Sequence, residues 1–276
     1  MLHKWLEMLE EFGWHTPLDE ITYGTTALDQ DFIKPLVIRN TEILRTPRKT
    51  GFKVLGTHLT FDNQDDVELD RRISGAWGAF HKFAPLLVCP VVPVEKRLEV
   101  LTRAVHPALF WCAGSWNLRR NQNSKLRGLQ LTMLRKMLRF KRQEGEDLGD
   151  FMRRTNSIIN NITARHRVAR WDTLGARAVF RWASKLISIS ALDPTRLTSL
   201  IFAYRDWEWI QSIASQNHGR PLHGRILKTW RWERPFYKFA GTYWKQEASD
   251  NFPVWLSKEA DFLEWWENNG MNQQWS

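Results

Sequence analysis

The chain has 276 residues and a mass of 32.7 kDa, which is enough for one large domain or two ordinary ones. Its content of 43% hydrophobic and 25% charged residues is ordinary globular usage, which excludes a disordered chain or a collagen. The two cysteines exclude a disulfide scaffold and a cysteine-rich zinc finger. The formal net charge of +10 favours an acidic partner.

No segment has the pattern of a membrane span or a secretion leader. The longest run without a charged residue covers 15 positions, 104–118, whereas a span needs about 20 apolar residues. No basic and then apolar leader follows Met1. We therefore expect no membrane partner, and a nuclear or cytoplasmic protein rather than a secreted one.

The positive charge is concentrated in the middle of the chain. Residues 1–70 carry a net charge of −6, residues 71–240 one of +20, and residues 241–276 one of −4. A polyanion gives a reason for this arrangement, because each lysine or arginine that neutralises a phosphate releases a counterion. A solvated basic surface without a partner is the alternative.

In chain order, the first elements form a small α+β region. Leu2, Leu6 and Leu9 recur at helical spacing, and Gly13 ends that helix. Short β-type runs follow at 36–38 and 52–55, separated by prolines and glycines.

Beyond residue 62 the pattern is helical almost to the end. Three apolar stripes predict helices over 69–80, 94–108 and 126–138, and later helices are expected over 146–163, 171–190, 195–216 and 225–268. The first three helices should share a core formed by Trp77, Phe80, Leu98, Leu101, Val105, Leu134 and Leu138. The fold class is therefore mainly α, with an α+β region over 1–65, a three-helix region over 66–145 and a tryptophan-rich helical region over 146–276.

Two clusters invite a metal-site interpretation and are better explained otherwise. Asp65 and Asp66 stand at the start of a predicted helix, where carboxylates cap free N–H groups and favour the helix dipole. His218 and His223 lie in a Gly/Pro-containing stretch without a nearby cysteine, which is typical of a loop. We therefore expect no metal ligands and no self-sufficient catalytic residues in this chain.

The segment 119–142 contains the strongest candidate site. It carries nine basic residues and no acidic one in 24 positions. With its apolar stripe it predicts a helix that packs on one face and is positive on the other, able to follow a phosphate backbone or an anionic membrane surface. An ordinary solvated face would intersperse glutamates. Nucleic acid is the favoured partner, through Arg119, Arg120, Lys125, Arg127, Arg135, Lys136, Arg139, Lys141 and Arg142.

Tryptophan is unusually abundant toward the C-terminus. Nine of the sixteen tryptophans lie between Trp207 and Trp275. Aromatic rings can stack on unpaired bases, but a tryptophan at helical spacing more often fills a core because its ring buries a large apolar area. Core packing is the expectation for most of them.

Four motifs in order resemble the region that follows the active site in reverse transcriptases of LINE-type (non-LTR) retrotransposons. Residues 51–57, GFKVLGT, resemble the primer-grip turn (Y/F)-x-x-L-G, with Leu55 and Gly56 as its last two residues. Residues 71–80 resemble the first thumb helix, x-R-R-I-x-x-A-W-x-A-F. Residues 96–116 and 126–139 resemble the second and third thumb helices.

The two ends of the chain are similar to the same family. Residues 1–14 look like the palm helix after the catalytic hairpin, and residues 231–250 follow the tail pattern R-W-x-D/E…G-x-x-W-x-x-x-A-x-D. Asn251 replaces the arginine of that pattern, and Trp255 comes one position late. The Lys-Thr after the palm helix is replaced by Ile21-Thr22.

The resemblance implies a C-terminal fragment of an RNA-directed DNA polymerase. It would comprise a distal palm remnant, a helical thumb and a helical tail, and would hold an RNA or RNA–DNA template–primer by its backbone, without sequence preference. The aspartate pair that binds magnesium would precede Met1, so the chain alone would be inactive and hold no cofactor. The missing palm and fingers part is then a further expected partner.

Two other interpretations stay open at this point. The chain could be a non-catalytic basic helical module that binds an acidic protein, or a degenerate open reading frame. A steep salt dependence and competition by bulk RNA would distinguish nucleic-acid binding from a protein interface.

Overall fold

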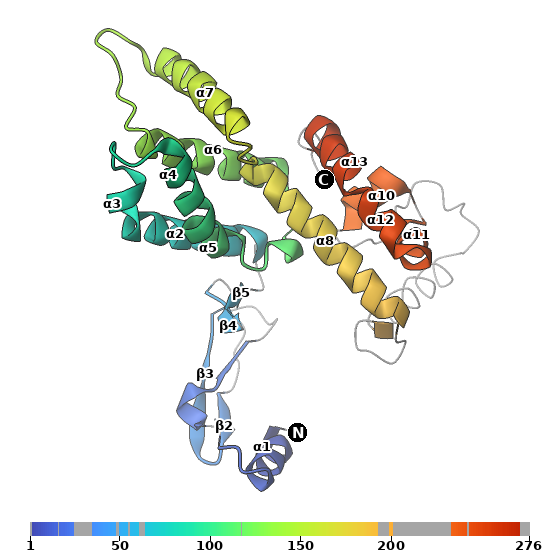
Figure 1. The fold of residues 1–276 in the computed structure, drawn as a ribbon. Coiled ribbons are helices and arrows are strands. Elements are labelled where there is room, and N and C mark those ends of the chain that lie inside the picture. Colours follow the sequence, from blue (N-terminus) through green and yellow to red (C-terminus); the bar gives the residue numbers. More distant parts are fainter. Residues whose placement is uncertain are drawn as a thin grey trace, which may run out of the picture. The chain divides into compact units, whose positions relative to one another are not determined.

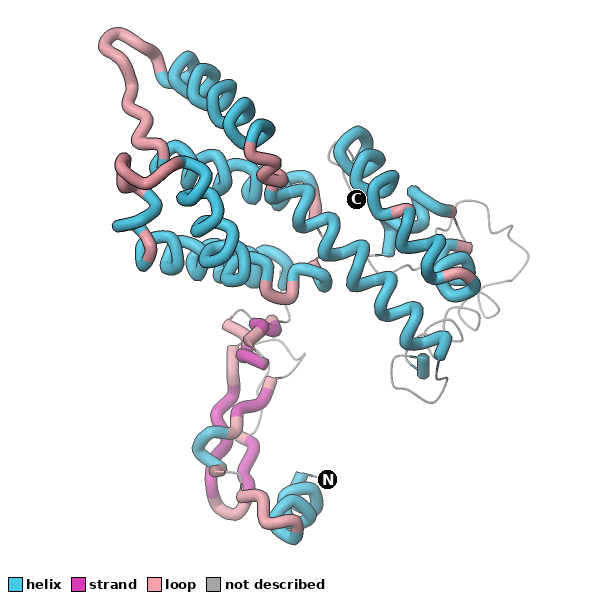
Figure 2. Tube along the Cα trace, in the orientation of Figure 1, coloured by secondary structure: helices cyan, strands magenta, loops and turns pink. Residues whose placement is uncertain are grey.

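A computed structural model describes the chain over 2–15, 17–24, 35–47, 50–54, 56–60, 64–116, 118–192, 199–200, 233–241 and 243–270. The protein divides into two compact units, Met1–Arg71 and Arg72–Ser276. The described strands belong to the first unit, and the second is helical (Figures 1 and 2). The mainly α class with a small α+β region at the N-terminus is confirmed.

The first unit is built around a β-hairpin. Strands β2 (Leu36–Ile38) and β3 (Thr41–Arg45) pair antiparallel, and β1 (Thr22–Tyr23) adds parallel to the other edge of β3. The two residues that join the hairpin, Arg39 and Asn40, both have positive φ, 47° and 63°. This is the left-handed backbone that a two-residue hairpin loop requires to match the twist of its strands.

Helix α1 (Leu2–Glu11) is held against this hairpin. Leu6 packs with Ile38 and Ile43 in a small core, and the Arg39 guanidinium donates to both carboxylate oxygens of Glu10, at 2.6 and 3.0 Å. The hydrogen bonds from Arg39 lower the pKa of Glu10. A short 3₁₀ turn, η1 (Leu18–Glu20), leads into β1.

The expected primer-grip turn coincides with a second hairpin. Strands β4 (Phe52–Val54) and β5 (Thr57–Leu59) pair with Val54 opposite Thr57. Gly56 at the turn has a φ of +83°, which favours glycine, while Leu55 lies outside the described residues. Helix α2 (Gln64–Lys82) then begins with Asp65 and Asp66 in its first turn, as predicted.

The helical unit continues with α3 (Ala84–Leu87), α4 (Val94–Val100), the π-helical turn η2 (Leu101–Val105) and α5 (His106–Phe110). The stripe over 94–108 predicts one helix, and the chain is helical throughout this stretch with a π turn inside it. Pro107 explains the turn, because proline has no N–H and its ring displaces the carbonyl four residues earlier.

The next three helices lie where the spacing of the apolar residues predicts them. They are α6 (Arg120–Met137), α7 (Leu148–Arg165) and α8 (Trp171–Leu192), with the 3₁₀ turn η3 (Ala113–Ser115) before α6. Phe80, Leu98, Leu101, Val105 and Leu134 are buried as expected. Trp77 and Leu138 are only half-buried, at the edge of this core.

Helix α8 is the element on which the helical unit is assembled. It packs against η3 and α6, and also against α11 (Trp244–Asp250), α12 (Phe252–Ser257) and α13 (Glu259–Trp265) (Figure 1). Phe180 of α8 stacks with Trp255 of α12 at 5.5 Å between ring centroids. The Trp255 indole donates to Ser184 at 2.8 Å, which satisfies its N–H inside the core.

The prediction of a single helix over 225–268 is wrong for the described part. The chain forms α10 (Arg234–Ala240), α11, α12, α13 and the π turn η5 (Trp266–Gly270). Gly241 has a φ of +82° and ends α10. Pro253 stands at the start of α12, where its missing N–H has no helical partner to lose. The helix expected over 195–216 lies almost entirely outside the described residues.

Across the described residues, none of the helices combines the length and the apolar character that crossing a bilayer requires.

The contact between η3 and α8 requires a glycine, which makes a test of the packing. A Cβ on Gly114 would lie 2.4 Å from the Cβ of Trp182, whereas one on Gly128 would meet nothing within 4 Å. We expect Gly114→Ala to destabilise the fold by about 1–3 kcal/mol and Gly128→Ala to stabilise it by about 0.5–1 kcal/mol. Urea denaturation measures both, and equal effects of the two substitutions would contradict this packing.

His106 gives the fold a defined acid sensitivity. Its Nε2 accepts a hydrogen bond from the Trp171 indole at 2.8 Å, and burial lowers its pKa to about 4. Between pH 6.5 and pH 4, His106 is therefore protonated in the unfolded chain and neutral in the folded chain. We expect up to about 3 kcal/mol of stability to be lost as pH falls through this window. His106→Gln keeps an acceptor for Trp171 and should remove this part of the pH dependence, measured by urea denaturation at pH 7 and pH 4.

Candidate nucleic-acid interface

The nine predicted basic residues do not form one face. Helix α6 buries a stripe that includes Leu126, Met133 and Met137, and the basic residues lie on both flanks of that stripe and beyond the helix end. The solvent-facing side of the helix carries small residues, among them Ser124, Gly128 and Thr132, all exposed. The nine residues therefore fall into groups that differ in their contacts.

Two of the nine are engaged with helix α7. Arg127 donates to Gln130 at 2.9 Å and to Asn160 at 2.6 Å. Arg135 donates to Thr155 at 3.2 Å and to Asn156 at 2.8 Å. Burial lowers the pKa of both guanidinium groups. These two arginines join α6 to α7, and their guanidinium groups are held there instead of pointing freely into solvent.

The other seven are distributed over both ends of α6. At the N-terminal end, Arg119 is half-buried and precedes the helix, while Arg120 and Lys125 are exposed. At the C-terminal end lies a second group, which we call the basic cluster and which consists of Lys136, Arg139, Lys141 and Arg142, all exposed. The ammonium of Lys136 also lies 5.5 Å from the ring centroid of Trp77.

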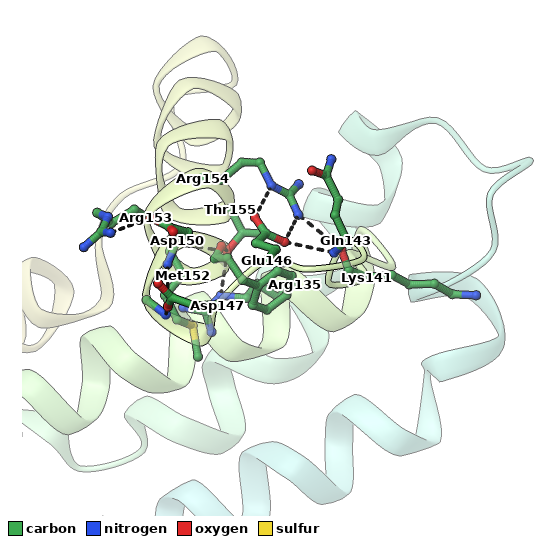
Figure 3. Close-up of polar contacts among 12 residues, drawn as sticks. Arg135, Lys141, Gln143, Glu146, Asp147, Asp150, Met152, Arg153, Arg154 and Thr155 are labelled. Atoms are coloured by element: carbon green, nitrogen blue, oxygen red, sulfur yellow. Dashed lines mark hydrogen bonds and ion pairs between the residues drawn. The ribbon is translucent and has the colours of Figure 1, made fainter.

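The loop that carries the basic cluster is fixed by side chains of α7 and of the loop itself. Arg154 donates to both carboxylate oxygens of Glu146, at 2.7 and 2.8 Å, and to the carbonyl of Lys141 at 3.2 Å (Figure 3). Glu146 in turn accepts from the backbone N–H of Gln143 at 2.9 Å. The hydrogen bonds from Arg154 and Gln143 lower the pKa of Glu146 to about 2, so it stays ionised at neutral pH.

The acidic residues that follow the cluster are largely neutralised within the same loop and helix. Glu146 pairs with Arg154, Asp150 pairs with Arg153, and Asp147 caps α7 by accepting from the backbone N–H of Asp150. Figure 3 shows these contacts on the α7 side of the loop, while the Lys141 side chain extends away from them. The field at the basic cluster is therefore positive, with exposed Glu144 as its nearest acid in the sequence.

Arg139 occupies a position that usually takes glycine. Its φ is +57°, directly after the C-cap of α6. The N–H of Phe140 donates to the Arg135 carbonyl at 3.1 Å and that of Arg139 to the Lys136 carbonyl at 3.2 Å, which is the Schellman pattern of a helix end. A side chain in the left-handed region costs free energy, so the fold is less stable with arginine at position 139 than it would be with glycine.

Sequence reasoning missed Arg97, which fixes the end of α6. This arginine is 7% exposed, and its Nη1 donates to the carbonyl of Met137 at 2.8 Å. A cation at a helix C-terminus is favoured by the helix dipole, and the carbonyl that Arg97 holds, that of Met137, is next to Lys136 of the basic cluster. The signal in the sequence is a basic residue three positions after Val94 and next to Leu98, on the stripe predicted to be buried.

The remaining features that the sequence suggested are the acidic and histidine clusters and the C-terminal tryptophans. No group of three or more histidine, cysteine, aspartate or glutamate side chains in the described ranges is arranged to hold a metal ion. His218 and His223 lie outside those ranges. Of the tryptophans from 207 onward, Trp244, Trp255 and Trp266 are buried in the α8 core, which confirms core packing for these three.

No protein-family model matches the sequence, and neither the curated proteins nor the solved structures include a significant match. The resemblance to LINE-type reverse transcriptases stays a prediction.

The left-handed backbone at Arg139 gives a test of the helix end. Arg139→Gly relieves the backbone while Arg139→Ala keeps it, and both remove the charge. We expect the glycine variant to be more stable than the alanine variant by about 1 kcal/mol. Urea denaturation gives the difference, and an alanine variant at least as stable as the glycine variant would exclude this backbone conformation.

Proposed function

We propose that the protein binds nucleic acid by its phosphate backbone, through the basic cluster at the end of α6. The observation that carries the proposal is the cluster itself: Lys136 in the last turn of α6 and three exposed basic side chains on the loop that follows, whose acidic residues are mostly engaged by α7. Lysine and arginine contacts to phosphates position a protein without reading the sequence. The expected ligand is an RNA or RNA–DNA duplex, bound without sequence preference.

The order of elements supports a more specific role. We infer that the chain acts as the distal palm, thumb and tail of a LINE-type reverse transcriptase. A small α+β unit with a glycine at the turn of its second hairpin precedes a unit that begins with helices α2, α4–α5 and α6. This is the order that the sequence motifs of that family imply. The basic cluster would then lie along the template–primer.

The proposal predicts a large effect of three neutralising substitutions. The variant Arg139→Gly, Lys141→Gln, Arg142→Gln removes three charges and leaves Arg135, which joins α6 to α7, in place. Wild-type affinity for an RNA–DNA duplex should fall by on the order of a thousandfold between 50 and 200 mM salt if about six phosphates are contacted. The variant should bind more weakly to every sequence, and its log–log salt slope should be smaller by about 3. Fluorescence anisotropy measures both.

A matched control changes the net charge equally elsewhere. Lys4, Arg71 and Lys185 are exposed and distant in sequence from the cluster. Their replacement by glutamine should leave most of the affinity and the slope intact. If the two triple variants bind alike, the basic cluster is not the interface. If wild type shows no salt dependence and bulk RNA does not compete, the partner is an acidic protein instead.

A further inference from the structure

A cleft of about 740 Å³ in the helical unit is lined by none of the four residues of the basic cluster. One side comes from α4 and η2, with Leu98 and Arg103, and the other comes from the end of α7 and the start of α8, with Arg165, Arg167 and Leu174. These segments are about sixty residues apart in the sequence. The volume is in the usual range of small-molecule sites, about 300–1,000 Å³.

The charged residues of the cleft leave two arginines available. Glu99 is neutralised by Lys96 at 3.2 Å and by Arg103 at 2.7 Å, and the hydrogen bond from Lys96 with the charge of Arg103 lowers its pKa. Among the residues that the structure describes, the side chains of Arg165 and Arg167 form no hydrogen bond or ion pair. The remaining carboxylate of the lining is the exposed Glu95.

Arg167 is held in a costly conformation. Its φ is +54°, and the N–H of Val168 donates to the Thr163 carbonyl at 2.8 Å, so α7 ends in the same Schellman pattern as α6. Glycine would fit this position with less strain. A strained residue that lines a cleft points to function, because such strain gathers at ligand sites.

The rest of the lining suits a flat, partly apolar group. Leu98, Val168, Ala169 and Leu174 supply apolar surface. His106 also lines the cleft and is neutral at pH 7, since its pKa is lowered by burial to about 4. Arginine guanidinium groups match the geometry of phosphate oxygens, and carboxylates accept hydrogen bonds from the amino groups of bases.

We propose that this cleft binds a nucleotide, with its phosphate on Arg165 and Arg167 and its base against the apolar wall near Glu95. The ligand is either a free nucleotide or an unpaired nucleotide of a strand. The proposal does not depend on the basic cluster, because the two sites share no residue. Nucleotide binding can therefore fail while duplex binding persists, and the reverse.

The test is calorimetric titration of the full chain with adenosine 5′-monophosphate, inorganic phosphate and adenosine. The nucleotide should bind saturably and more tightly than either of its parts. Arg165→Gln and Arg167→Gly should each weaken nucleotide binding by about tenfold, the loss of one charge-assisted hydrogen bond. Glu95→Gln should also weaken it, because the base amino group loses its carboxylate acceptor. Because Arg167→Gly also relieves the backbone, the variant should be no less stable than wild type, which separates lost binding from misfolding.

Lys185→Gln is the control. It removes one positive charge from an exposed position of α8 outside both proposed sites, as Arg165→Gln does inside the cleft, and should leave nucleotide binding unchanged. The proposal is overturned if the nucleotide does not saturate, if inorganic phosphate binds as tightly, or if Lys185→Gln weakens binding as much as Arg165→Gln. A single-stranded oligonucleotide that displaces the nucleotide identifies a strand as the source, and lack of displacement identifies the free nucleotide; the cleft is a nucleotide site in both cases.

Discussion

The helical unit depends on how Trp171 is held at the start of α8. Its side chain is fully buried, its indole N–H donates to His106, and its backbone N–H donates to Gln130 at 3.2 Å. Gln130 is itself buried and donates to the carbonyl of Ala169 at 2.9 Å. These contacts join the start of α5, helix α6 and the start of α8 at one point. A buried polar network of this kind is costly to break, because each unpaired group would remain without water.

Both proposed sites lie on elements that meet at this junction. The cleft is lined by His106 and by residues on either side of Trp171, and the basic cluster follows the C-terminal end of α6. Loss of the Trp171 contacts would therefore disturb the two surfaces together. The acid sensitivity expected from His106 has the same origin, since protonation removes the acceptor for the indole and places a charge in a buried site.

The arginines of this unit serve two separate purposes. Arg97, Arg127 and Arg154 donate to carbonyls, amides or carboxylates of a neighbouring helix or of the loop between α6 and α7, and so position the segment that carries the cluster. Arg139 and Arg167 stand at helix ends, in left-handed backbone that would suit glycine better. The helix dipole favours cations there, yet its contribution of about 0.3–1 kcal/mol does not clearly exceed the backbone strain of about 1–2 kcal/mol. Recognition of an anion gives a reason for arginine at both positions.

Hydrophobic periodicity by itself determined which stretches are helical, because an amphipathic helix must repeat its apolar residues every three to four positions. It placed α1, α2, α6, α7 and α8 within a few residues, and the net charge of the middle of the chain indicated a polyanion. Tertiary structure alone decided which arginines are available: Arg127 finds its partner Asn160 33 positions later, and Arg97 finds Met137 40 positions later. It also formed the cleft from two distant segments, whereas the breaks of the expected C-terminal helix fall at Gly241 and Pro253, which are local signals in the sequence itself. Pairing of this kind depends on contacts between helices, which a one-dimensional pattern of apolar and charged residues does not specify.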